Sequence, residues 1–115
     1  MEALDLLKRF DDLIKSIEII EYNEEERVSK LKIRVLLFDN SILWVREVKI
    51  REKLIAYSYY WLRSNGKIII GWDNAPHHRE ISTFPHHKHV GKNIEPSHET
   101  NLEDVLEFIH SFYFE

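Results

Sequence analysis

The middle of this chain alternates apolar and polar side chains with the period of a β-strand, and short turns separate the alternating segments. Between residues 28 and 38 an apolar side chain returns at every second position, at Leu31, Ile33, Val35 and Leu37. This pattern is typical of a strand with one face on a core. Asp39-Asn40-Ser41 and Ser64-Asn65-Gly66 have the composition of tight turns, because Asn and Gly tolerate positive φ. Neighbouring strands joined by such short turns must run antiparallel.

We therefore predict an antiparallel meander of about five strands, over residues 17–22, 28–38, 42–50, 54–62 and 67–72. The third strand is expected to bury Trp44, Val48 and Ile50, and Trp61 and Trp72 are expected in the same core. Arg46 interrupts that apolar face. It therefore either reaches the open surface of the sheet or pairs with an acid, and if it enters a site it is a phosphate ligand.

Helical spacing is found at both ends of the chain. The first fourteen residues repeat apolar side chains at intervals of three and four, at Ala3, Leu6, Leu7, Phe10, Leu13 and Ile14. Near the other end, Thr100 and Glu103 have the spacing of a capping box, which predicts the start of a second helix. Its apolar face consists of Leu102, Val105, Leu106, Ile109 and Tyr113. Residues 1–115 are thus expected to form a single α+β domain with a helix at each end of the sheet.

Composition removes several functional classes. The chain has no Cys, which excludes thiol catalysis and thiolate ligands, so His, Asp or Glu would have to bind any metal. A net charge of -4 argues against a generally basic nucleic-acid binder. We find no secretory signal and no apolar run of membrane-spanning length, so a cytoplasmic protein is expected. The lack of Gln, with abundant Ile, Lys and Glu, hints at a thermophilic source.

The strand periodicity stops after Asp73, and a histidine-rich loop is expected up to His98, with one short extended piece over residues 80–84. Six of the seven histidines lie between residues 77 and 98, and five of these six fall in the strings Asp73-Asn74-Ala75-Pro76-His77-His78 and His86-His87-Lys88-His89. Imidazole titrates near neutral pH and binds metals in its neutral form. The spacing predicts two imidazoles and Lys88 facing a common pocket.

These strings resemble the TumE family of toxins, which is paired with helix-turn-helix antitoxins in bacterial and archaeal type II toxin–antitoxin modules. The resemblance covers roughly residues 54–109 and rests on Tyr57-Ser58-Tyr59, Trp61, Gly66-Lys67, Asp73–His78, Ile81 and Thr83–His89. A histidine often follows the Tyr-Ser-Tyr string in that family, where this chain has Tyr60. The resemblance implies a toxin with an antitoxin partner that covers its site.

A metal-independent ribonuclease is the chemistry we expect first. One neutral histidine would remove the ribose 2′-OH proton while a protonated one supplies a proton to the leaving oxygen. The candidate catalytic residues are Asp73, His77, His78, His86, His87, Lys88 and His89. Tyr57 and Tyr59 share one strand face and could stack on bases if they are not buried, and Arg79 or Arg46 could bind phosphate.

Other interpretations remain open. His77, His87 and His89 with Asp73 could hold a Zn, Mn or Ni ion that activates water or fixes the loop. Another group-transfer toxin is less well supported, since no glycine-rich phosphate cradle is present. In a non-enzymatic protein-interaction module, the histidines would only bond to the backbone of a polar lid. The acidic loop 24–26 or the aromatic end 112–114 could contact an antitoxin or a second copy in a homodimer.

Overall fold

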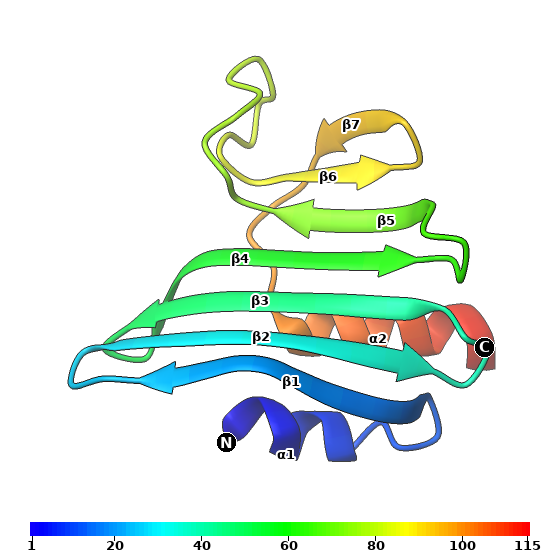
Figure 1. The fold of residues 1–115 in the computed structure, drawn as a ribbon. Helices are drawn as coiled ribbons and strands as arrows, with labels where there is room; N and C mark the ends of the chain where they lie inside the picture. Colours follow the sequence, from blue (N-terminus) through cyan, green and yellow to red (C-terminus); the bar gives the residue numbers. More distant parts are fainter.

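In a computed structural model that describes residues 1–115, one sheet of seven antiparallel strands pairs its strands in chain order, from β1 to β7 (Figure 1). The elements are α1 (Glu2–Lys8), β1 (Ile14–Glu24), β2 (Val28–Leu37), β3 (Ile42–Ile50), β4 (Lys53–Leu62), β5 (Ile68–Asp73), β6 (His87–Val90), β7 (Asn93–Pro96) and α2 (Leu102–Phe114). The α+β class, the two terminal helices and the antiparallel meander are confirmed. Neither helix has the length and apolar character that a bilayer crossing requires.

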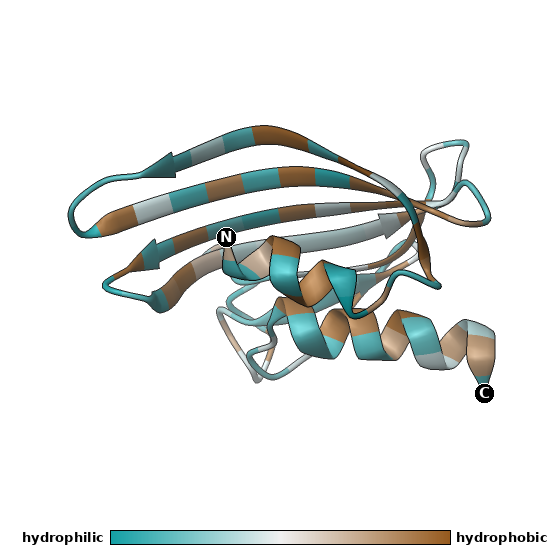
Figure 2. Cartoon of the chain, turned by 90° about the horizontal axis from the view of Figure 1, so that it is seen from below, coloured by the Kyte–Doolittle hydropathy of each residue, from teal (hydrophilic) through white to brown (hydrophobic).

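Both helices lie on the same side of the sheet, and the strands alternate hydrophilic and hydrophobic positions along their length (Figure 2). We call the face toward the helices the inner face and the opposite one the outer face. The core lies between the inner face and the helices. It comprises Ala3, Leu7, Phe10, Leu13, Leu31, Ile33, Val35, Leu37, Leu43, Val45, Tyr57, Tyr59, Trp61, Ile70, Trp72, Leu102, Val105, Leu106 and Ile109.

The sheet has two strands more than expected, because part of the histidine-rich segment is extended. His87 to Val90 pair with Asp73 to Ile70, and β7 then folds back on β6 through a tight turn with Gly91 at φ +59. A sheet ladder needs only backbone N–H and C=O groups, so polar side chains do not prevent pairing. The short extended piece expected over residues 80–84 is absent. Successive turns replace it, with backbone bonds such as Ile81 N–H to His78 C=O at 3.1 Å.

The first helix is shorter than the apolar spacing predicts. α1 ends at Lys8, and the chain then tightens, since the N–H of Phe10 bonds the C=O of Leu7 and the N–H of Leu13 bonds that of Phe10. Phe10 and Leu13 are nevertheless buried. The spacing therefore identified the core residues correctly but not the end of the helix.

The buried face of β3 is the opposite of the one expected. Leu43, Val45 and Glu47 are buried, whereas Trp44 is half-buried and Arg46 exposed on the outer face. The register against β2 decides this, because antiparallel partners share a face and the clear alternation of β2 fixes the pairs Val35–Leu43 and Ile33–Val45. Arg46 accordingly reaches the open surface of the sheet. Trp61 and Trp72 are core residues as predicted.

The N-cap residue of α2 lies one position after Thr100, the N-cap that the capping box predicts. Asn101 is the N-cap, and its side-chain oxygen accepts a 2.9 Å hydrogen bond from the N–H of Asp104. Asn is at least as good an N-cap residue as Thr. The predicted apolar face is confirmed, since Leu102, Val105, Leu106 and Ile109 are buried and Tyr113 packs against the core.

Candidate functional site

Asp73 is the last residue of β5 and the centre of a polar cluster on the outer face of the sheet. Its carboxylate is buried. Oδ1 accepts a 3.0 Å hydrogen bond from the N–H of Ala75 and lies 3.0 Å from Nε2 of His87. Oδ2 accepts a hydrogen bond from the hydroxyl of Tyr60 and lies 3.6 Å from Nε2 of His89. One carboxylate therefore positions two imidazoles and a phenol.

The strand register explains why these side chains meet. Asp73 pairs with His87, and the next pair with the same orientation is Gly71 with His89. Tyr60 pairs with Gly71 from the other side, so its ring lies over the glycine. A Cβ on Gly71 would lie 2.3 Å from Cδ1 of Tyr60, which no side chain at that position could tolerate without displacing the ring. Gly71 thus leaves the space in which Tyr60 reaches Asp73.

His87 uses both of its ring nitrogens. Nδ1 lies 2.9 Å from the carbonyl oxygen of Pro85 and Nε2 lies 3.0 Å from Asp73, while the side chain is only 2% exposed. Both neighbours are oxygen atoms that accept hydrogen bonds, so both ring nitrogens are engaged. His87 is therefore an enclosed, fixed part of the cluster.

His78 joins the cluster from the loop between β5 and β6. Its backbone has φ +60, and its ring centroid lies 5.1 Å from that of His87 and 5.9 Å from that of His89. One nitrogen from each of these three rings lies within 4.8 Å of the others, which is a grouping that could hold a metal ion. His77 is exposed and outside the group. The structure thus has His78 where the predicted metal set had His77.

Burial and neighbouring charges set the protonation of the residues that reach solvent. Desolvation lowers the pKa of His89; Asp73 partly opposes this effect, and His87 and His78 add to it. Burial, followed by the hydrogen bond and the charge of Asp73, raises the pKa of Tyr60. The lowered pKa favours the neutral form of His89 near neutral pH, and Tyr60 keeps its hydroxyl proton.

Four predicted site residues lie away from the cluster, on the inner side of the sheet. Tyr57 stacks on Tyr59 with ring centroids 5.4 Å apart, and its hydroxyl lies 2.8 Å from Nδ1 of His86. Tyr59 is fully buried and donates a 2.5 Å hydrogen bond to Glu47. Burial raises the pKa of Tyr57 to about 12. Lys88 pairs with Trp72, so alternation along β6 directs it away from His87 and His89.

The predicted arginines lie apart from each other. Arg79 is exposed in the loop, with its guanidinium 5.8 Å from the centre of the Phe84 ring. Arg46 lines a groove of about 510 Å³ on the outer face, whose other walls include Lys32, Trp44 and Tyr60. Lys32 holds its ammonium 5.6 Å from the centre of the Trp44 ring.

Tyr60 is the site residue that the sequence analysis missed. The pattern Tyr57-Ser58-Tyr59-Tyr60 is aromatic on both faces of β4, so alternation alone does not reveal which face is buried. The signal that could have identified Tyr60 is its cross-strand partner on β5, which is Gly71. Pairing through the Asn65-Gly66 hairpin brings Tyr60 opposite Gly71, two residues from Asp73.

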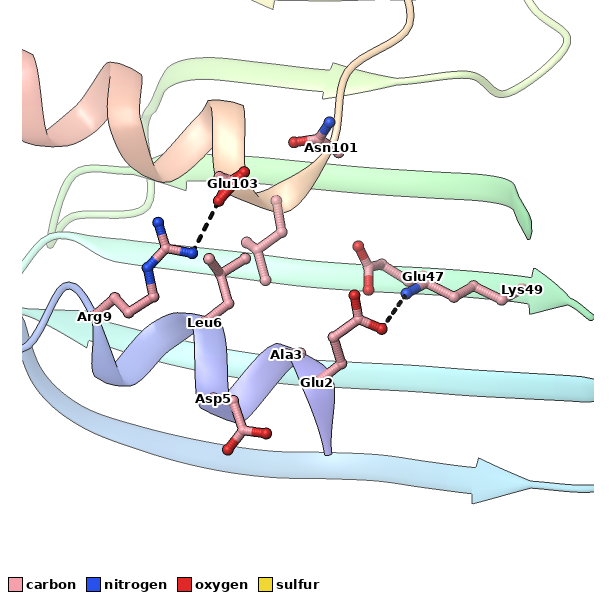
Figure 3. Close-up of a pocket in the computed structure, with 10 residues that line it drawn as sticks. Glu2, Ala3, Asp5, Leu6, Arg9, Glu47, Lys49, Asn101 and Glu103 are labelled. Carbon is pink, nitrogen blue, oxygen red and sulfur yellow. Dashed lines mark hydrogen bonds and ion pairs between the residues drawn. The ribbon is translucent and has the colours of Figure 1, made fainter. Parts of the chain in front are cut away.

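A second cavity, of about 470 Å³, lies between α1, β3 and the start of α2 (Figure 3). Its charged groups are largely paired with each other. Arg9 donates a 3.0 Å hydrogen bond to Glu103, and Lys49 lies 3.8 Å from Glu2. No histidine lines this cavity, and the figure shows Asp5 turned away from both pairs. The Asp73 cluster is therefore the better candidate for a chemical site.

Comparison with known proteins gives one match. The family model described as Toxin TumE matches residues 3–113, which is nearly the whole chain. No curated protein and no solved structure matches the chain. The matched range is wider than the resemblance noted above and includes all the residues of the Asp73 cluster.

Proposed function

The chain belongs to the TumE family of toxins and so has a toxin's role in a toxin–antitoxin module, and we propose that it exerts this role by cleaving RNA at the Asp73 cluster. The observation that carries the proposal is the cluster itself. Two imidazoles, those of His87 and His89, flank one buried carboxylate, and His78 lies against both rings. The side chains of His78 and His89 are 31% and 23% exposed, and Nδ1 of His78 also lies 3.5 Å from the carboxylate of Glu80. Imidazoles at a partly open site are the groups best suited to move protons near neutral pH.

The proposed reaction needs only a proton acceptor and a proton donor. A neutral imidazole takes the proton from the ribose 2′-OH, and the resulting oxygen attacks the adjacent phosphorus. The bond from phosphorus to the 5′-oxygen breaks, and a second imidazole gives its proton to that oxygen. The products are a 2′,3′-cyclic phosphate and a 5′-hydroxyl, and the proton count is conserved.

We propose His89 as the proton acceptor, because its lowered pKa keeps it neutral, and His78 as the donor. His87 and Asp73 are positioning residues in this scheme. Both nitrogens of His87 are already engaged, so it has no free atom with which to take a proton.

A metal-activated water is a second candidate, and one observation favours it. A metal-binding histidine usually donates its other N–H to a carbonyl or carboxylate, and Nδ1 of His87 has such a partner in Pro85. Zn²⁺ bound by His78, His87 and His89 would have three protein ligands and one open position. Mn²⁺ is the alternative ion.

The test is cleavage of a mixed RNA pool by the purified, untagged protein, with and without EDTA. The His78→Ala and His89→Ala variants are compared with His77→Ala, which removes an exposed imidazole next to His78. We expect cleavage that survives EDTA, persists in His77→Ala and falls about 100-fold or more in the other two variants. End-group analysis should find 2′,3′-cyclic phosphates.

Each other result has a definite meaning. Cleavage lost in EDTA and restored by Zn²⁺ or Mn²⁺ would replace the acid–base scheme with the metal scheme. If no RNA is cut under any condition, a different toxin chemistry or a non-enzymatic interaction replaces both.

The family also implies an antitoxin partner. We propose that this antitoxin carries a helix-turn-helix domain, covers the Asp73 cluster and holds the toxin inactive in the cytoplasm. A homodimer of the free toxin is a further proposal. Sedimentation of the purified chain, alone and with its antitoxin, tests both assemblies.

A further inference from the structure

The groove on the outer face combines cationic and aromatic side chains beside the Asp73 cluster. Lys32 and Arg46 are exposed on adjacent strands, and Arg34 is half-buried beside them. Trp44 and Tyr60 are cross-strand partners that form the aromatic wall. None of the three cations has a salt bridge to an acidic group, although the net charge of the whole chain is -4.

The groove leads directly to the cluster. Arg46 pairs with Ser58, and Ser58 pairs with Asp73, so the three lie in one row across the sheet. At about 4.8 Å per strand, Arg46 and Asp73 are about 10 Å apart along this row. Tyr60 belongs to both sites, because it lines the groove and donates to Asp73.

Acidic side chains of β1 limit the positive charge of the groove on the side away from the cluster. Glu18 lies opposite Arg34 and Glu21 lies opposite Lys32, which places acidic side chains of β1 on the same face. The cationic strip is thus confined to β2 and β3. The aromatic pair lies in the row beside it, where Arg34 pairs with Trp44, Trp44 with Tyr60 and Tyr60 with Gly71. A ligand along these two rows contacts cations and aromatic rings before it reaches the cluster.

From this arrangement we infer that the groove binds a single-stranded segment of RNA, with phosphates at Lys32 and Arg46 and a base against Trp44 and Tyr60. The inference rests on the proposed function and deepens it by naming the surface that holds the substrate. Single strands are commonly bound by basic grooves with aromatic side chains on which bases stack. A duplex has its bases stacked inside and offers none to such a wall.

The test measures binding without cleavage. The probe is a fluorescein-labelled 2′-O-methyl RNA of about ten nucleotides, which lacks the attacking hydroxyl and matches the footprint of a small single-strand site. Anisotropy gives the Kd over a range of salt concentrations, for the parent protein and for Arg46→Ala and Trp44→Ala. Arg27→Ala and Tyr22→Ala are the matched controls, since they remove an exposed cation and an exposed aromatic ring elsewhere.

We expect Arg46→Ala to weaken binding and to reduce the slope of log K against log salt by about 0.7, the value for one phosphate contact on a single strand. Trp44→Ala should weaken binding about tenfold or more. Trp44→Phe should restore most of the affinity, because a ring remains for stacking. Such a recovery would also show that the loss in Trp44→Ala comes from the missing ring and not from a disturbed fold. RNA should quench the tryptophan fluorescence of the parent but much less that of Trp44→Phe, since Trp61 and Trp72 are buried.

Parent-like affinity in both Arg46→Ala and Trp44→Ala, or equal affinity for a duplex of the same length, would overturn the inference. So would variants that lose affinity for the antitoxin while RNA binding stays unchanged. The experiment distinguishes failure of the proposed RNA cleavage from failure of the proposed RNA-binding groove. If RNA binds the groove but natural RNA is not cut, only the proposed cleavage is contradicted. If RNA is cut equally well by the parent and the groove variants, only the proposed groove is contradicted.

Discussion

Asp73 and His87 lie directly opposite each other on β5 and β6, and Nε2 of His87 lies 3.0 Å from Oδ1 of Asp73. The pair is fixed by the backbone ladder as well as by its side chains. The carbonyl of Pro85, just before β6, holds the other ring nitrogen of His87. A substitution at Asp73 should change the orientation of the imidazoles while the sheet around them persists.

Asp73→Asn should reduce the kcat of RNA cleavage about 100-fold or more while the Kd for RNA stays near that of the parent, because the amide NH2 group cannot accept the hydrogen bonds with which the carboxylate orients its neighbours. The buried hydrogen-bonding groups left unsatisfied should cost about 1–3 kcal/mol of unfolding free energy. Single-turnover cleavage, RNA anisotropy and urea unfolding measure the three quantities. A parallel loss of kcat and RNA affinity would contradict a positioning role.

Tyr60→Phe keeps the ring over Gly71 and removes the hydroxyl that donates to Asp73. RNA affinity should be unchanged, and kcat should fall about tenfold, since a buried carboxylate has lost one of its donors. Tyr57→Phe is the matched control, because its hydroxyl bonds His86 on the other side of the sheet. An equal effect of the two substitutions on kcat would show that the outer-face hydroxyl has no special role.

Asn101→Ala should destabilise the protein by about 1 kcal/mol, the usual cost of losing a side-chain N-cap. Thr100→Ala should cost much less, because Asn101 rather than Thr100 accepts the hydrogen bond of the first turn. Thermal or urea unfolding of the two variants distinguishes the observed cap from the predicted one. The reverse order of stabilities would restore the capping box at Thr100.

Asp39 gives the stability a measurable pH dependence. Burial alone would raise the pKa of this carboxyl, but hydrogen bonds from Ser41 and Tyr113 outweigh burial and lower the pKa. A lowered pKa in the folded state stabilises the protein above the unfolded value of about 3.9, and this contribution is lost as the pH falls through the folded pKa. The side chain is exposed, so solvent screening keeps the effect to a fraction of a kcal/mol.

Asp39→Asn should therefore be slightly less stable than the parent at pH 7, and the difference should shrink below about pH 4. Urea midpoints at several pH values measure it. A difference that is constant or grows in acid would mean that the hydrogen bonds of Asp39 do not depend on its charge.

The parts of the fold that could be predicted are those with an unambiguous period. The alternation of Leu31, Ile33, Val35 and Leu37 identified the inner face of β2, and the helical spacing identified the buried face of α2. β3 is apolar on both faces, so its register was fixed only by pairing with β2. β6 and β7 were missed because their four-residue sequences, His87–Val90 and Asn93–Pro96, do not alternate apolar and polar side chains.

The candidate site was predicted as a list of residue types but not as an arrangement. The two strings around Asp73 and His87 do meet, as their histidine content indicated. The sequence does not specify which imidazoles meet. The positive φ of His78 brings its ring to the cluster, and side-chain alternation along β6 places Lys88 on the face opposite His87 and His89. Alternation along β4 likewise puts Tyr60 rather than Tyr57 or Tyr59 beside Asp73.

Because the sheet pairs its strands in chain order, every residue of the Asp73 cluster comes from one uninterrupted stretch between Tyr60 and His89. The cations of the groove come from an earlier stretch, Lys32 to Arg46, and the turn at Arg51 and Glu52 separates the two. A genetic crossover in that turn would exchange the cationic strands and leave the imidazoles with their carboxylate. If the two proposals hold, most of the groups that bind the target could be exchanged independently of the groups that react, with Tyr60 remaining beside the carboxylate.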